Sequence, residues 1–60
     1  MPDYFQGQIA ALRQMVNAES PGIRAELSEY GNVHRDNRAV IAAECATEAL
    51  DSLVRLVNLG

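Results

Sequence analysis

The chain has few of the features by which a domain of sixty residues stabilises itself. It contains one cysteine, Cys45, so no disulfide can form within it, and one histidine, His34. A structural zinc site needs four ligands, mainly Cys and His, and these two residues cannot supply them. A core of this size gives only marginal stability. We therefore expect self-association into a homodimer or a higher oligomer, with no metal and no cofactor.

Lysine is also missing, and the five basic residues, all arginine, are outnumbered by eight acidic ones. Because phosphate neutralisation dominates nucleic-acid affinity, a net charge of −3 argues against nucleic acid as a partner. The sequence contains no run of about 18 apolar residues, the length that a membrane span needs. Its first residues lack the pattern of a secretion signal. We expect a cytoplasmic protein. The use of arginine alone suggests a GC-rich coding sequence of bacterial or phage origin.

Helical spacing of apolar residues recurs along the chain, and the alternation typical of strands does not occur. Ser20 followed by Pro21 is a signal for the start of a helix. Gly31 and Asn32 tolerate the left-handed conformation that ends one, so we place a joint there. The pattern predicts three helices, over residues 4–18, 21–30 and 33–58.

An alternative is one unbroken helix over residues 21–58. A single stripe of that helix would contain Ile23, Leu27, Tyr30, His34, Ile41 and Cys45. In either case the fold class is all-α, a small helical hairpin or three-helix unit with one long C-terminal amphipathic helix. The whole chain, residues 1–60, is one domain that we expect to assemble into a helical-bundle oligomer.

The last predicted helix has the strongest amphipathic pattern. The side chains of its apolar half are small near the start of the helix and larger near its end. This half comprises Ala39, Ala42, Ala43, Ala46, Ala49, Leu50, Leu53, Val54, Leu56 and Val57. The first predicted helix has one apolar stripe, formed by Phe5, Ile9, Leu12 and Val16. Half a helix surface is more than this one helix can cover. We therefore expect these residues to form the core or an oligomer interface.

No group of residues predicts catalysis. His34 and Cys45 are 11 residues apart, about 16 Å along an unbroken helix, which is too far for a base and its nucleophile. Cys45 is more typical of a small buried hydrophobic residue. The tripeptide His34-Arg35-Asp36 has the letters of the protein-kinase motif, but Ile41 stands where that motif requires Asn. We expect a protein without enzymatic activity.

His34, Arg35 and Arg38 are the only concentration of positive charge in the chain. If Asn32 caps the last helix, they lie beside the free N–H groups of its first turns. Positive charge is unfavourable there unless an anion sits between the side chains. That anion is either a carboxylate of the protein, such as Asp36, or an anionic ligand. These three residues are therefore the candidate ligand-binding site.

The function that these observations favour is binding. We expect a self-associating, non-enzymatic helical protein that binds another protein and regulates or inhibits it, as an adaptor or inhibitor. The first alternative is an oligomer that binds or sequesters an anionic or nucleotide ligand through Arg35 and Arg38. The second is a dimeric helix-turn-helix repressor, since Arg and Asn at the start of the last helix could contact base edges.

Overall fold

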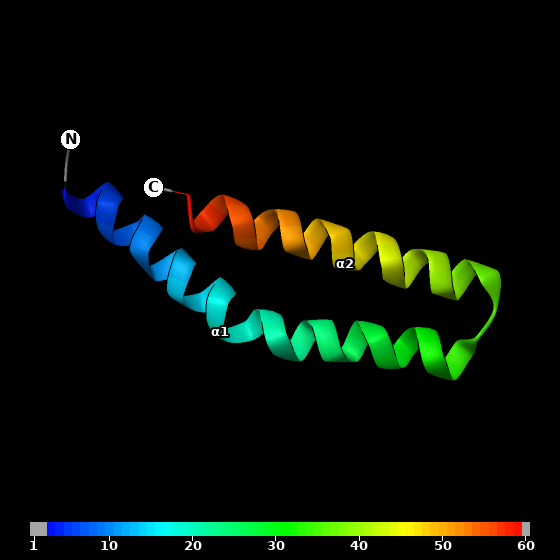
Figure 1. Ribbon diagram of the computed structural model, residues 1–60. Helices are drawn as coiled ribbons and strands as arrows, with labels where there is room; N and C mark the ends of the chain where they lie inside the picture. Colours follow the sequence, from blue (N-terminus) through cyan, green and yellow to red (C-terminus); the bar gives the residue numbers. More distant parts are fainter. Residues whose placement is uncertain (1–2, 60) are drawn as a thin grey trace.

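The structure is a hairpin of two antiparallel helices (Figure 1). The computed structural model describes residues 3–59, and describes side chains for residues 6–59. Helix α1 spans Asp3–His34, helix α2 spans Asn37–Val57, and Arg35 and Asp36 form the turn. The hairpin measures 48 × 15 × 13 Å. The all-α class expected from the apolar periodicity is confirmed, and neither helix is long and apolar enough over the described residues to cross a membrane.

The prediction of three helices was wrong, because the segments 4–18 and 21–30 belong to one helix. Pro21 lies inside α1, where proline removes a backbone hydrogen bond. The helix bends in its middle, in the cyan part of the ribbon, and does not end there (Figure 1). Val16 is buried before the proline and Leu27 is half-buried after it. Packing against α2 on both sides of Pro21 thus keeps α1 continuous.

The joint between the helices lies later than Gly31 and Asn32, where we predicted it. The chain continues as helix to His34, and Arg35 adopts the left-handed conformation, with φ of 54°, that ends α1. The backbone N–H of Arg35 donates to the carbonyl of Gly31 at 3.1 Å. Because glycine or asparagine usually takes this position, an arginine there gives no recognisable stop signal.

Asp36 starts α2. Its backbone is extended, and its Oδ1 accepts a hydrogen bond of 2.8 Å from the backbone N–H of Ala39, the geometry of an N-cap. The predicted start at residue 33 was therefore early by one turn. The alternative of one helix over 21–58 was also wrong, because the chain reverses direction at this turn (Figure 1).

The core is a narrow seam between the two helices. Its buried apolar residues are Val16, Ala39, Ala43 and Val57, and its half-buried ones include Leu27, Ala46, Leu50 and Val54. No large side chain among the described ones is fully buried. Gly31 also faces this seam, since a Cβ placed on it would lie 3.5 Å from the Cβ of Ala43. Small residues thus let the helices approach closely near the turn.

Polar contacts join the helices away from the turn. Arg13 Nε donates to the carbonyl oxygen of Val57 at 2.7 Å, which satisfies a carbonyl at the end of α2. The side-chain amides of Asn17 and Asn58 donate to each other at 2.9 and 2.8 Å. These contacts align the middle of α1 with the end of α2.

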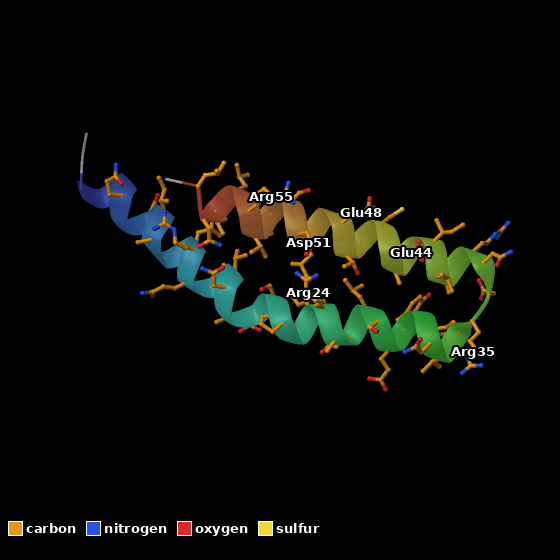
Figure 2. The ribbon with its side chains drawn as sticks, viewed as in Figure 1. Arg24, Arg35, Glu44, Glu48, Asp51 and Arg55 are labelled. Carbon is orange, nitrogen blue, oxygen red and sulfur yellow. The ribbon has the colours of Figure 1, made fainter. Side chains whose placement is uncertain are left out.

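An ion pair lies between the helices nearer the middle of the hairpin. Arg24 and Asp51 point toward each other and form a salt bridge (Figure 2). Arg55, one turn along α2 from Asp51, has the i, i+4 spacing that favours an ion pair within a helix, but Asp51 pairs with Arg24 instead. Both paired side chains are partly exposed, so the pair contributes at most about 1 kcal/mol to stability. The pair also shows which parts of the two helices lie side by side, since Arg24 of α1 is opposite Asp51 of α2.

This alignment leaves the first turns of α1 beyond the end of α2. Arg13 is already level with Val57, the last residue of α2. Ile9 and Leu12, predicted to lie in the core or an oligomer interface, are exposed in the single hairpin, because α2 does not extend far enough to cover them. Phe5, from the same prediction, lies outside the residues whose side chains the structure describes.

The N-cap predicts a measurable loss of stability on substitution. Asp36→Ala removes the acceptor of the Ala39 N–H and should lower the free energy of unfolding by about 1 kcal/mol. Asp36→Asn keeps an acceptor and should stay near the wild-type value. Urea denaturation followed by circular dichroism, at one fixed chain concentration, measures both. Equal losses for the two variants would show that the cap does not hold the turn.

The close approach at Gly31 predicts a small gain in stability when alanine replaces this glycine. Gly31→Ala places a methyl group in ordinary contact with Ala43 and improves helix propensity, so the free energy of unfolding should rise by about 0.5–1 kcal/mol. Gly22→Ala is the matched control, because its Cβ would meet no atom within 4 Å. Gly31→Leu should instead lower stability by about 1–3 kcal/mol through overpacking. A stable Gly31→Leu protein would contradict the close packing of this seam.

Candidate functional site

The candidate residues His34, Arg35 and Arg38 lie around the turn but on different elements. His34 is the last residue of α1, Arg35 is in the turn, and Arg38 is in the first turn of α2. The prediction that all three belong to the start of one helix was wrong. His34 and Arg35 instead lie at the C-terminal end of α1, where positive charge interacts favourably with the helix dipole.

Two of these three side chains interact with α1 itself. Arg35 Nε donates to the carbonyl oxygen of Asn32 at 3.0 Å, as basic residues often do at the end of a helix. The ring of His34 lies 4.2 Å from that of Tyr30, centroid to centroid, at an angle of 45°. Figure 2 shows Arg35 at the turn, with its side chain directed outward. The cluster thus completes the end of α1.

The carboxylate of Asp36 occupies the N-terminus of α2. A negative charge at this end of a helix is the favourable partner of its dipole. From the sequence we expected an anion near the start of the last helix, either a carboxylate of the protein or an anionic ligand. The structure places such a carboxylate there.

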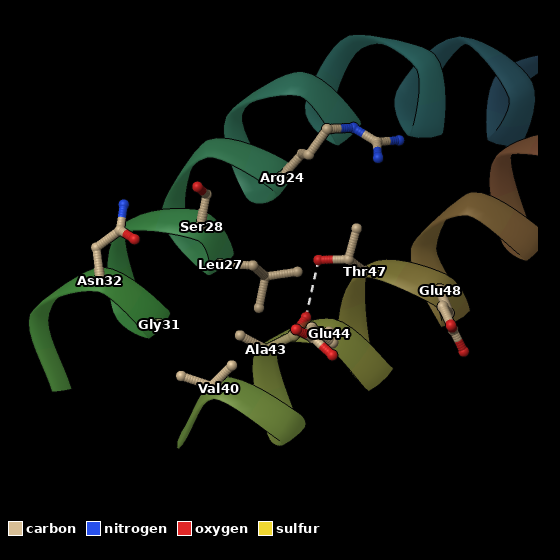
Figure 3. Close-up of a pocket in the computed structure, with 10 residues that line it drawn as sticks. All are labelled: Arg24, Leu27, Ser28, Gly31, Asn32, Val40, Ala43, Glu44, Thr47 and Glu48. Atoms are coloured by element: carbon tan, nitrogen blue, oxygen red, sulfur yellow. Dashed lines mark hydrogen bonds between the residues drawn. The ribbon is translucent and has the colours of Figure 1, made fainter. Parts of the chain in front are cut away.

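A shallow groove of about 600 Å³ runs along one side of the seam (Figure 3). Leu27, Val40 and Ala43 form its apolar floor between the helices. Its polar rim is formed by Arg24, Ser28, Asn32, Glu44, Thr47 and Glu48. We call this side of the hairpin the polar face. Sequence reasoning missed this groove, since its residues come from two helices whose relative position no local pattern reveals.

Some polar side chains of the polar face are occupied by contacts within the hairpin, and others are exposed. Thr47 Oγ1 donates to the carbonyl of Ala43 at 2.8 Å and is thereby occupied (Figure 3). Arg24 is held by Asp51. Glu44 and Glu48 are exposed along the outer edge of α2.

The opposite side of the seam is apolar. A hollow of about 260 Å³ there is lined by Leu27, Tyr30, Ala42, Ala43 and Ala46. Exposed residues of both helices extend this surface along the hairpin. We call it the apolar face and define it by Leu12, Met15, Ile23, Tyr30 and Val33 of α1 and Ala42, Cys45, Ala49, Leu53 and Leu56 of α2.

Helix geometry explains why these residues share one side. On both helices the face residues recur at helical spacing and lie on average about 80–90° from the residues of the seam, in the same rotational sense. On α1 this side also contains the carboxylates of Glu19 and Glu26. Because α1 and α2 run in opposite directions, the same rotational sense brings both sets to one side of the hairpin. Tyr30 from α1 and Ala42 from α2 meet there, in the lining of the hollow.

The exposed fractions show how incompletely this side is covered. Leu53 is 42% exposed, Tyr30 45% and Leu56 64%. Of the residues predicted as core or interface, only part therefore lies in the seam, while Ala42, Ala49, Leu53 and Leu56 are exposed on the apolar face. Cys45, which we expected to be buried, is exposed there too.

No group of three or more His, Cys, Asp or Glu side chains that could hold a metal ion occurs in the part of the chain that the structure describes. Comparison with known proteins gives no further guide to the site. No protein-family model, no curated protein sequence and no solved structure matches this chain.

The left-handed backbone of Arg35 leads to a prediction about the turn. Arg35→Gly should raise the free energy of unfolding by about 0.5–1 kcal/mol, because glycine adopts positive φ without steric cost. Arg35→Ala loses the hydrogen bond to Asn32 without this relief and should be slightly less stable than wild type. Denaturation of the three proteins at equal concentration checks the order. If the Arg35→Ala protein were as stable as the Arg35→Gly protein, Arg35 would not be held in this conformation in solution.

Proposed function

We propose that this protein is a non-enzymatic helical binding protein that associates with itself and binds and regulates another protein, as an adaptor or inhibitor. The observation that carries the proposal is the division of the hairpin into two unlike faces. The apolar face exposes large aliphatic and aromatic side chains, and the polar face has a shallow groove with a charged rim. Contiguous exposed apolar surface on a small protein is typical of an interaction site.

The two faces suit two kinds of contact. An apolar surface formed by the sides of two helices packs well against other helices, so we assign it to association. The polar face then remains at the surface of the assembly. Its exposed carboxylates, Glu44 and Glu48, beside the apolar floor residues Leu27 and Val40, suit a segment of a partner protein that carries both positive and apolar side chains.

The two alternatives have less support. In a helix-turn-helix DNA reader the helices cross at about 90–120°, whereas α1 and α2 run antiparallel (Figure 1). For an anionic ligand, the first turn of α2 already has the carboxylate of Asp36. Arg35 also uses its Nε to complete the end of α1. Neither alternative has an observation that favours it over protein binding.

Affinity capture from the native source tests the proposal. The tagged wild-type chain should retain a protein partner in a fixed molar ratio, detected by mass spectrometry. Glu44→Lys combined with Glu48→Lys reverses the charge on the rim of the groove, and should reduce the recovered partner at least tenfold by like-charge repulsion.

The matched control is Glu29→Lys combined with Ala18→Lys, which adds positive charge at exposed positions of α1 outside both the groove lining and the apolar face. This control should retain the partner. Circular dichroism establishes that both double variants remain helical. Failure of the wild-type chain to retain any protein would contradict the proposed binding, and equal loss in both double variants would contradict its assignment to the polar face.

A further inference from the structure

The hairpin exposes more surface than a compact protein of its mass. Its accessible surface is 4821 Å², whereas a globular monomer of 6.5 kDa exposes about 3,800 Å². The excess is close to the roughly 800 Å² that each partner buries in a standard protein interface. Its radius of gyration is 14.6 Å, against about 10 Å for a compact chain of sixty residues. A single partner on the apolar face would therefore remove the excess.

The apolar residues of α2 indicate how many neighbours this helix has. At about 100° per residue, the arc from Leu56 through Ala46 to Val54 covers about 160°, wider than the stripe of about 100° that suits one neighbour. Its centre points neither at α1 nor straight out of the apolar face, but between them. A helix of a four-helix bundle has such an arc, because it contacts two neighbours and faces the bundle axis.

Helix α1 has the same property. Val16 and Leu27 face α2 across the seam, and Leu12, Ile23 and Tyr30 lie toward the apolar face. Each helix thus has apolar side chains that contact the other helix and, on the adjacent side, apolar side chains that belong to the uncovered apolar face. The hairpin therefore has the residue pattern of one half of a four-helix bundle.

Near the turn, the apolar face is complementary to itself in side-chain size. The residue of α1 there is the large Tyr30, and the residues of α2 there are the smaller Ala42 and Cys45. Tyr30 and Ala42 line the same hollow, so they lie at neighbouring positions along the hairpin. A second hairpin related to the first by a two-fold axis parallel to the helices has each residue at the same height along that axis. This symmetry places Tyr30 of each copy opposite Ala42 and Cys45 of the other, an arrangement that fills space well.

The charges on the face favour the same arrangement. Glu19 and Glu26, two turns apart on α1, interrupt the apolar face between Met15 and Val33 on one side and Ile23 and Tyr30 on the other. Two copies joined with α1 against α1 would bring these carboxylates together, which is unfavourable. With α1 against α2, the residues of the second copy at the same levels of its apolar face are the uncharged Ala49 and Leu56.

We propose that a second copy of this chain covers the apolar face, giving a two-fold symmetric four-helix bundle in which α1 of each copy lies against α2 of the other and both turns are at the same end. This inference rests on the self-association part of the proposed function and specifies its partner and geometry. It leaves the groove of the polar face open on each copy.

Sedimentation equilibrium over a wide range of chain concentrations tests the number of copies. The expected mass is twice that of the 6.5 kDa chain. Leu53→Glu introduces a charge into the proposed interface and should weaken the dimer by roughly 30-fold or more in Kd. Ile41→Glu is the matched control, since Ile41 is 59% exposed and lies outside the apolar face. It should leave Kd unchanged.

Because Leu53→Glu could also disturb the hairpin, disulfide trapping uses positions that are already exposed. In a Cys45→Ser background, chains with Glu26→Cys and chains with Ala49→Cys are mixed and oxidised. In the proposed dimer, position 26 of one copy lies beside position 49 of the other. The mixture should therefore give a covalent dimer on a non-reducing gel, and neither chain alone should do so.

The outcomes separate this inference from the rest of the proposed function. A trimer, a larger oligomer, or efficient crosslinking of the Glu26→Cys chain with itself would overturn the proposed bundle while leaving self-association intact. A chain that stays monomeric at the highest concentration would overturn self-association as well. Capture of the protein partner through the polar face, with its own control variant, is measured independently of both results.

Discussion

The close approach of the two helices near the turn is the constraint on which the rest of the structure depends. Gly31 has no side chain, and Ala39 and Ala43 have only a methyl group each, so the backbones of α1 and α2 lie near one another at this end. Alanine and glycine bury little apolar area. The seam is therefore narrow, and larger apolar side chains beside it, such as Tyr30 and Leu53, remain partly exposed.

The positions of the apolar and charged residues around each helix, relative to this seam, explain why the hairpin has one apolar and one polar face. Leu53 and Tyr30 lie to one side of the seam on their helices and remain partly exposed there. The charged residues Arg24, Glu44 and Glu48 lie toward the other side. In the proposed function, the apolar face serves self-association and the polar face serves recognition of a partner protein.

The turn shows how a cluster of charged residues can have a structural role. Arg35 ends α1, Asp36 begins α2, and His34 packs against Tyr30. Each of these residues satisfies a need that arises where a helix begins or ends, namely a free carbonyl, a free N–H group or a dipole charge. The left-handed backbone of Arg35 has an energetic cost, and the close packing of the seam beside it holds the chain in this conformation.

The sequence by itself determined the all-α class, the amphipathic character of α2 and its gradient from small to large side chains, because helical periodicity and propensity are local properties. The sequence did not reveal that α1 passes through Pro21 or that the chain turns at Arg35. There, packing against a distant segment outweighed the local preferences of proline and glycine.

The candidate site depended still more on the tertiary structure. The sequence predicted which residues of α2 are apolar, but not that Ala39 and Ala43 lie in the seam while Leu53 and Leu56 lie on an open face. That division depends on where α1 contacts α2, which the pairing of Arg24 with Asp51 marks. Periodicity tells which residues share a side of a helix. Only the position of a neighbouring helix decides which part of that side is covered.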